Sequence, residues 1–145
     1  MAWAIEHGAS SWQREHLAHS LVERNDGEFK SKLDRYKYFD RYPEFPQSHY
    51  FELALDFLNE LEAFLSLNAD GQLSLLDTGE SALDVAIFPF IRQFAFVDKP
   101  LFDSQNLPKL QAWLDQYLTS ELFAQVMSKY SAWNAEQKER IIFGV

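Results

Sequence analysis

The sequence contains no cysteine, few glycines and prolines, and no long apolar run, and each shortage excludes something. Without cysteine the chain can supply no disulfide, no thiolate ligand for a metal and no cysteine nucleophile. Five glycines and five prolines in 145 residues are too few for a turn-rich β fold and favour helices. No apolar stretch approaches the roughly 18 residues that a membrane-spanning helix needs, and the first residues lack the features of a signal peptide. We therefore expect a cytoplasmic protein with no membrane segment.

Basic residues are also in short supply, with 13 lysines and arginines against 22 aspartates and glutamates. The resulting net charge of -9 at pH 7 repels phosphate backbones and acidic lipid headgroups, so we expect neither nucleic acid nor a membrane as a partner. Apolar side chains, by contrast, are abundant. With 47% hydrophobic and 16% aromatic residues, the sequence can bury the core of one domain spanning residues 1–145.

Apolar side chains recur at helical spacing along most of the chain, which predicts an all-α fold, a bundle of five to seven helices. The segment 82–97 has almost no polar face, so we expect it to be the buried central helix. The sequence Asn25-Asp26-Gly27 is typical of a turn and predicts that one helix ends before it and the next begins after it. The other segments expected to be helical are 11–24, 28–42, 47–67, 107–118 and 120–130, with a loop over 72–80.

Two of these helices begin with residues typical of helix caps. Ser81 and Asp84 have the spacing of a capping box, in which each side chain accepts a hydrogen bond from the backbone N–H of the other residue. Such boxes occur at many ordinary helix starts. This one opens an almost wholly apolar helix, where each unmet buried donor would cost about 1–3 kcal/mol. Asn106, just ahead of Leu107 and Pro108, is the predicted cap of the helix over 107–118.

Two stretches of the sequence resemble the all-helical C-terminal domain of the cytosolic glutathione S-transferases. They are GESALDVAIFPFIRQFAFVD at residues 79–98 and LPKLQAWLDQYL at residues 107–118. In that family a Ser/Thr-x-x-Asp box starts the buried central helix, so the resemblance implies that Ser81 and Asp84 serve folding rather than chemistry.

The same resemblance implies where glutathione would bind. In the family, glutathione and its activating residue belong mainly to an N-terminal thioredoxin-like domain, and no strand-helix-strand pattern of that kind is present in this sequence. We therefore expect the chain to lack the glutathione site and to hold no cofactor itself. Glutathione would bind only where a thioredoxin-like partner supplies that site.

Three side chains are candidates for a ligand-binding or interdomain face: Arg92, Tyr36 and Tyr38. Arg92 interrupts an otherwise apolar helix and needs a carboxylate or several carbonyls if it is buried. A structural ion pair with an aspartate is therefore favoured over a ligand contact. The two tyrosines are predicted to form an aromatic and basic face with neighbouring arginines, which the resemblance would place near the thioredoxin-like domain or a dimer partner. For both tyrosines, core or surface packing is favoured over a role at such a face.

The sequence assigns no catalytic residue and no metal site. His16 and His19 have a spacing that metal ligands sometimes use, but no Glu-x-x-His pattern completes a site, so surface histidines are favoured. Glu60 and Glu62 point away from each other on a helix and are expected to be solvated. The signatures of serine hydrolases, Walker-type nucleotide sites and dinucleotide-binding folds are not present in the sequence.

Two functions from different classes follow. The resemblance implies a domain that supplies the hydrophobic co-substrate side of a glutathione transferase site and that is inactive alone. The alternative is a non-catalytic interaction or dimerisation module. An apolar face without its partner domain could be buried by a second copy of the chain or by another protein. The expected partners are accordingly a hydrophobic small molecule, a thioredoxin-like domain or a second copy of the chain.

Overall fold

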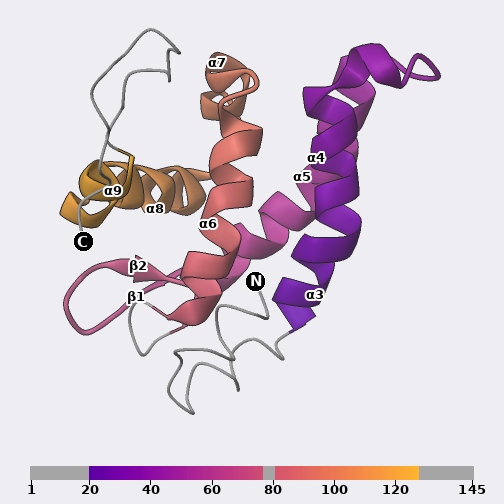
Figure 1. Cartoon of the computed structure of the whole chain (residues 1–145). Coiled ribbons are helices and arrows are strands. Elements are labelled where there is room, and N and C mark those ends of the chain that lie inside the picture. Colours follow the sequence, from indigo (N-terminus) through magenta and orange to yellow (C-terminus); the bar gives the residue numbers. More distant parts are fainter. Residues whose placement is uncertain (1–19, 77–80, 128–145) are drawn as a thin grey trace, which may run out of the picture.

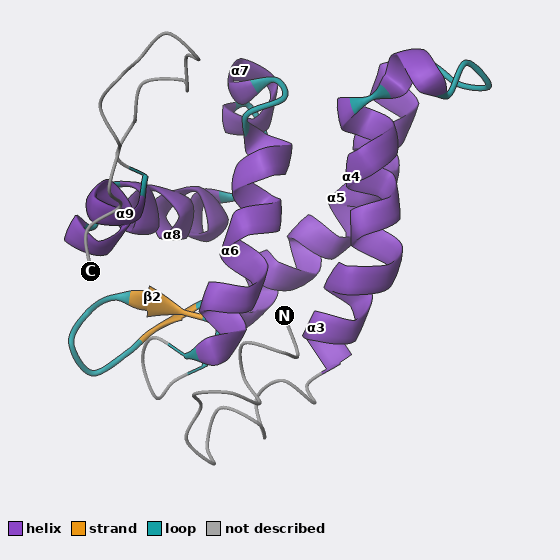
Figure 2. Cartoon of the chain, in the orientation of Figure 1, coloured by secondary structure: helices purple, strands orange, loops and turns teal. Residues whose placement is uncertain are grey.

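The computed structural model describes residues 20–76 and 81–127, and their regular structure is almost entirely helical (Figures 1 and 2). Its elements, in chain order, are α3 (Ser20–Arg24), the π-helical turn η1 (Asn25–Phe29), α4 (Lys30–Lys37), the 3-10 turn η2 (Phe39–Arg41), α5 (Gln47–Phe64), β1 (Ser66–Leu67), β2 (Leu73–Ser74), α6 (Ala82–Ala95), α7 (Lys99–Asp103), α8 (Pro108–Leu118) and α9 (Glu121–Val126). Because α3, η1 and α4 follow one another without a break, the described part of the chain has six helices. The predicted all-α bundle is confirmed.

Helix α6 lies between two groups of helices. In Figure 1 the antiparallel pair α4 and α5 stands on one side of α6, while α8 and α9 cross its other side. Buried positions along α6 include Leu83, Ile87, Ile91 and Phe94, each of which has no exposed surface. Helix α6 is therefore the centre of the core, as its almost continuous apolar sequence predicts.

Aromatic rings fill the space where α6 meets α4 and α5. The ring of Phe94 lies 4.8 Å from Tyr36, 5.4 Å from Phe51 and 5.6 Å from Phe29, centroid to centroid. Phe29 in turn lies 4.8 Å from Phe57 of α5. These distances fall in the range of favourable ring pairs, so the cluster ties three helices together through aromatic packing.

The predicted break at residues 25–27 is wrong, because the helix continues through them as the π-helical turn η1. Asn25 is fully buried there, and Arg24 anchors the segment to α5 by pairing with Asp56 at 2.9 Å and with Glu60. A π-helical turn accommodates an extra residue without ending the helix. Tertiary contacts to α5 thus outweigh the local preference of this sequence for a turn.

A small antiparallel hairpin connects α5 to α6, where the sequence predicts the end of a helix and a loop. Strand β1 pairs with β2 in the register Ser66 to Ser74 and Leu67 to Leu73. Its turn includes Gly71 at φ 75°, a conformation that favours glycine. The side-chain amide of Gln116 on α8 both donates to and accepts from the backbone of Leu73, at 3.0 Å each. A side chain of α8 therefore extends the hairpin like a further strand.

Helices α5 and α8 cap each other's ends. The Glu62 carboxylate of α5 accepts from the backbone N–H groups of Lys109 at 3.1 Å and Leu110 at 2.7 Å, in the first turn of α8. The Lys109 ammonium donates to the carbonyl of Leu65 at the end of α5, at 3.0 Å. Helix α8 begins after Leu107 without a side-chain cap of its own, so Asn106 does not fill the role that the sequence predicts.

The two glutamates expected to be solvated therefore both have partners. Glu60 pairs with Arg24, and Glu62 caps α8. The prediction considered only their own helix, whereas both partners come from segments distant in sequence.

Candidate functional site

Ser81 and Asp84 form the reciprocal capping box at the start of α6. The Ser81 hydroxyl accepts from the Asp84 backbone N–H at 3.4 Å, and the Asp84 carboxylate accepts from the Ser81 backbone N–H at 3.1 Å. The Ser81 hydroxyl also donates to Asp84 Oδ2 at 2.7 Å. Both residues are buried, with Asp84 fully so.

Asp84 also accepts two hydrogen bonds from outside the capping box. Its Oδ1 accepts from the backbone N–H of Leu75 at 2.9 Å and from the indole Nε1 of Trp113 at 3.0 Å. The two oxygens thus accept four hydrogen bonds in all, which is the full capacity of a carboxylate. Asp84 joins the hairpin exit, α6 and α8, and it has no acceptor site left for a substrate.

Tyr36 lies in the aromatic core, in the packing role that the sequence favours for it, and not on the candidate ligand or interdomain face. Its side chain is only 2% exposed, with its ring between Phe51 and Phe94. The reason is helical periodicity. Tyr36 follows Phe29 and Leu33 at helical spacing, and all three side chains lie on the same buried side of this helical segment. Burial, with a smaller contribution from the negative charge of Asp98, raises the pKa of Tyr36 to about 12.

Tyr38 lies on the surface, separated from Tyr36 by the end of α4. Cations pack on its ring: the Arg41 guanidinium carbon at 4.7 Å from the ring centroid and the Lys37 Nζ at 5.1 Å. Basic side chains therefore do pack around Tyr38, without Tyr36, and the role of this surface as a ligand or interdomain face stays a prediction.

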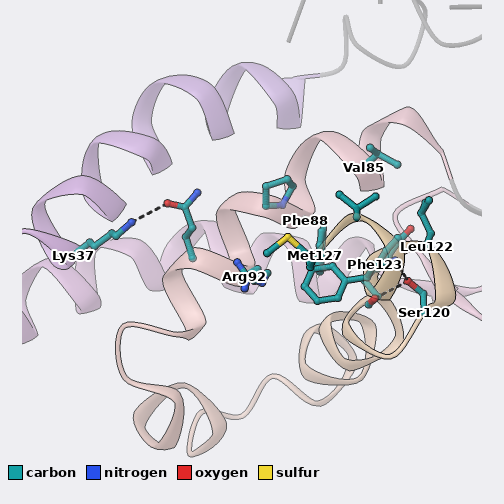
Figure 3. Close-up of a pocket in the computed structure, with 12 residues that line it drawn as sticks. Lys37, Val85, Phe88, Arg92, Ser120, Leu122, Phe123 and Met127 are labelled. Atoms are coloured by element: carbon teal, nitrogen blue, oxygen red, sulfur yellow. Dashed lines mark hydrogen bonds between the residues drawn. The ribbon is translucent and has the colours of Figure 1, made fainter. Parts of the chain in front are cut away.

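A cavity of about 550 Å³ lies between α6, α8 and α9, with the end of α4 at its edge (Figure 3). Its size is that of a small-molecule site. Most of its lining is apolar or aromatic, and the residues concerned are Val85, Phe88, Pro89, Tyr117, Leu122, Phe123, Val126 and Met127. Among the described residues, the lining also includes the polar or charged side chains of Lys37, Arg92, Gln93 and Ser120. We call this cavity the α6–α9 pocket.

Aromatic contacts hold α9 in position against α6. The ring of Phe88 on α6 lies 5.7 Å from Phe123 of α9 and 5.0 Å from Tyr117 of α8. The Ser120 hydroxyl accepts from the Phe123 backbone N–H at 3.1 Å and so caps α9, as expected for a helix starting at residue 120. The pocket walls are therefore three helices packed through one aromatic cluster.

Arg92 forms no ion pair within residues 20–76 and 81–127, so the predicted structural salt bridge is not found there. Instead its guanidinium carbon lies 5.6 Å from the ring centroid of Phe96 and 5.3 Å from that of Phe123. Its Nε atom is buried and has no hydrogen-bond partner in the described part of the chain. Figure 3 shows the side chain beside Phe123 and Met127 in the α6–α9 pocket.

The other polar lining residues are already engaged. Lys37 Nζ donates to the Gln93 side-chain oxygen at 3.2 Å across the gap between α4 and α6, the dashed contact of Figure 3. Ser120, besides capping α9, donates to the carbonyl of Tyr117 at 2.8 Å. Arg92 is therefore the charged lining residue whose guanidinium has neither an ion pair nor a hydrogen bond to the described residues.

Metal ligation and membrane spanning find no support in the described residues. Within these ranges no three histidine, aspartate or glutamate side chains gather as a metal site would require. His16 and His19 lie outside the described residues. None of the helices in residues 20–76 or 81–127 has the length and apolar content of one that crosses a bilayer.

The pocket residues other than Arg92 were not identified from the sequence. The sequence shows only that Val85, Pro89 and Gln93 are spaced four apart on α6, and the structure shows that all three are exposed although the helix looks apolar all round. Such a stripe on a central helix indicates a face that its neighbours leave open. Sequence alone does not reveal which of the apolar faces this is.

Comparison with known proteins identifies the family. The family model for the glutathione S-transferase C-terminal domain matches residues 22–116, well over half of the chain. No curated protein and no solved structure gives a significant match. The match includes the capping box, all of α6 and most of α8, the elements that the structure joins through Asp84. The chain therefore belongs to the glutathione S-transferase C-terminal domain family.

Proposed function

We propose that this domain supplies the apolar, co-substrate side of a glutathione transferase site, with glutathione held by a thioredoxin-like domain. The observation that carries the proposal is the α6–α9 pocket, a cavity of about 550 Å³ with a mostly apolar lining, in a chain of this family. Apolar walls with a few polar groups are typical of sites for small hydrophobic ligands. Such a site contributes by binding and orienting the electrophile beside the glutathione sulfur.

The described residues themselves support binding better than chemistry. Asp84, the fully buried carboxylate, is saturated by structural hydrogen bonds, and no cysteine exists to act as a nucleophile. The activation of glutathione is therefore assigned to the thioredoxin-like domain in this proposal, as the family resemblance implies.

The direct test is glutathione conjugation to chlorodinitrobenzene, measured with the purified chain, with a separately expressed thioredoxin-like domain of a glutathione S-transferase, and with both together. We expect background rates from the chain alone and a higher rate from the mixture than from the thioredoxin-like domain alone. Conjugation by the chain alone would contradict the assignment of glutathione to another domain.

Two matched variants test whether the α6–α9 pocket is responsible. Val126→Asp places a charge at a pocket residue that is 70% exposed, so folding should be unaffected while binding of the electrophile falls. Leu53→Asp makes the same kind of change on α5, at a residue 42% exposed and outside the pocket. The proposal requires the first variant to lower the rate of the mixture and the second to leave it unchanged.

A second candidate function is a non-catalytic interaction or dimerisation module. The observation that favours it is a group of exposed apolar side chains in and beside the pocket: Val85, Phe96, Leu122, Val126 and Met127. Exposed apolar groups gathered in this way are typical of surfaces that another protein covers. Light scattering over a range of concentrations tests this candidate, because association that Val126→Asp abolishes would support it and a monomer at every concentration would contradict it.

A further inference from the structure

We propose that the α6–α9 pocket selects apolar ligands that carry one negative charge, such as an aromatic sulfonate or carboxylate, and that Arg92 binds the anionic group. This inference deepens the proposed function and rests on it, since it requires that the pocket take a small molecule. Its basis is the contrast between Arg92 and the other polar groups of the lining.

The first step concerns the unused donors of Arg92. The guanidinium packs near two aromatic rings, at 5.6 Å from Phe96 and 5.3 Å from Phe123, and contact with ring faces uses none of its N–H groups. No carboxylate in the described ranges pairs with it, and its buried Nε lacks a hydrogen-bond partner there. A half-buried cation with free donors in a planar fork is well suited to a carboxylate or sulfonate.

The second step concerns the local charge. The whole chain carries 22 acidic residues and a net charge of -9. Among the residues that the structure describes, the pocket lining includes Lys37 and Arg92 and no aspartate or glutamate. The pocket therefore has a positive local charge on a negative protein. An anion inside it gains attraction that the surrounding surface does not offer, and low polarity strengthens that attraction.

The third step concerns the shape of the ligand. Arg92 lies among Phe88, Phe123 and Met127, with more apolar lining toward Leu122 and Val126. A ligand that fills the pocket and also pairs with the guanidinium therefore needs an apolar body as well as a charge. Small inorganic anions lack that body and should bind poorly.

Two fluorescent probes with the same ring system provide the test. Anilinonaphthalene sulfonate carries one sulfonate, and phenylnaphthylamine is the neutral counterpart. Titrations of the full chain should give tighter binding of the sulfonate than of the neutral probe. Arg92→Met should weaken sulfonate binding about tenfold or more, while the affinity for the neutral probe changes by less than about twofold.

Two further variants keep the test specific to the pocket. Arg41→Met removes an exposed cation that packs on Tyr38, outside the pocket lining, and should leave the binding of both probes unchanged. Val126→Asp adds a negative charge at the pocket and should weaken sulfonate binding. Rising salt concentration should reduce the affinity for the sulfonate more than for the neutral probe.

The outcomes separate this inference from the proposed function. Binding of the neutral probe without an Arg92-dependent preference for the sulfonate would overturn the inference and leave the proposed function standing. Sulfonate binding that Val126→Asp or Arg92→Met does not change would also overturn it, because the probe would then bind elsewhere. Failure of both probes to bind would overturn the inference and the proposed function together.

Discussion

Asp84 and Arg92 are the two charged residues of α6, and the structure surrounds them differently. Asp84 lies at the start of the helix, has no exposed surface and accepts hydrogen bonds from Ser81, Leu75 and Trp113. Arg92 lies near the other end, is half-buried and has only aromatic rings beside it in the described ranges. One end of α6 is saturated with internal partners, whereas the other keeps hydrogen-bonding capacity unused.

This difference separates a structural charge from a candidate functional one. A buried charge with a complete set of partners contributes to the fold, and removing it leaves several donors unpaired. A charge with unused donors in an apolar cavity adds little to the fold and can bind something from outside. The predictions that follow test this distinction, from the largest expected effect to the smallest.

Replacing Asp84 should have the largest effect. Asp84→Ala leaves the buried donors of Leu75, Trp113 and Ser81 without an acceptor, so we expect the free energy of unfolding to fall by about 3–5 kcal/mol. Urea unfolding monitored by tryptophan fluorescence measures it. Ser81→Ala, which removes only the hydroxyl of the box, should cost about 1 kcal/mol. Equal losses from the two variants would show that the hydrogen bonds from Leu75 and Trp113 add nothing.

Tyr36 should make stability depend on pH in the alkaline range. Its hydroxyl is buried near Phe94 of α6, without a hydrogen-bond partner in the described residues, and its pKa is raised to about 12. An unfolded tyrosine ionises near pH 10, so from pH 10 to 12 ionisation favours the unfolded state. Stability should fall over that interval by up to about 2 kcal/mol, and below it this effect disappears.

Tyr36→Phe provides the control for that prediction. At pH 7 the variant should be at least as stable as the original protein, with an unchanged or higher midpoint of urea unfolding. The reason is that an unpaired buried hydroxyl contributes no stability. Between pH 10 and 12 the variant should also lose most of the decrease in the free energy of unfolding. Burial also raises the pKa of Tyr50, so a smaller decrease remains in the variant. An identical alkaline decrease in both proteins would contradict the assignment to Tyr36.

Removing Glu62 extends the comparison to a second carboxylate that accepts structural hydrogen bonds. Glu62→Ala leaves the first turn of α8 without the acceptor for Lys109 and Leu110, so we expect a loss of about 1–2 kcal/mol. Chemical denaturation of the variant measures the loss. Glu52→Ala, an exposed position on the same helix, should change stability by less than about 0.5 kcal/mol. A loss as small as that of Glu52→Ala would show that backbone capping by another helix is unimportant here.

Arg92→Met should have the smallest effect on stability. The variant keeps an unbranched side chain against Phe96 and Phe123 and removes a charge with no ion pair in the described ranges, so we expect a change within about 0.5 kcal/mol. The same urea titration measures it. A loss comparable to that of Asp84→Ala would end the distinction between the two charges and make Arg92 a structural residue.

Local patterns in the sequence predicted the fold well and the candidate site only in part. The apolar run over 82–97 and the spacing of Ser81 and Asp84 identified the central helix and its cap, because helical period and capping depend on residues close together in the chain. Arg92 was also singled out, as the one cation in an apolar helix. Its neighbour Phe123 comes from α9 and Met127 directly follows that helix, and no local pattern joins α9 to α6.

The errors arose where distant segments meet. Asn25-Asp26-Gly27 is typical of a turn, yet burial of Asn25 and the pairing of Arg24 with α5 keep the segment helical. Tyr36 is a candidate for a ligand or interdomain face in the sequence, with packing favoured, and the stripe that it shares with Phe29 and Leu33 faces the core. In both cases the outcome depended on which surfaces of η1 and α4 the partner helices cover.

By itself, the sequence determined that this protein is a helical bundle with a capped, apolar central helix, and that it resembles the glutathione S-transferase C-terminal domain. Those properties follow from periodicity, capping chemistry and composition, each of which acts over a few neighbouring residues. Only the tertiary structure decided that Asp84 would be saturated and Arg92 left with free donors in a cavity. The physical reason is that hydrogen-bond partners and open surfaces depend on how distant helices pack, and packing is a property of the whole fold.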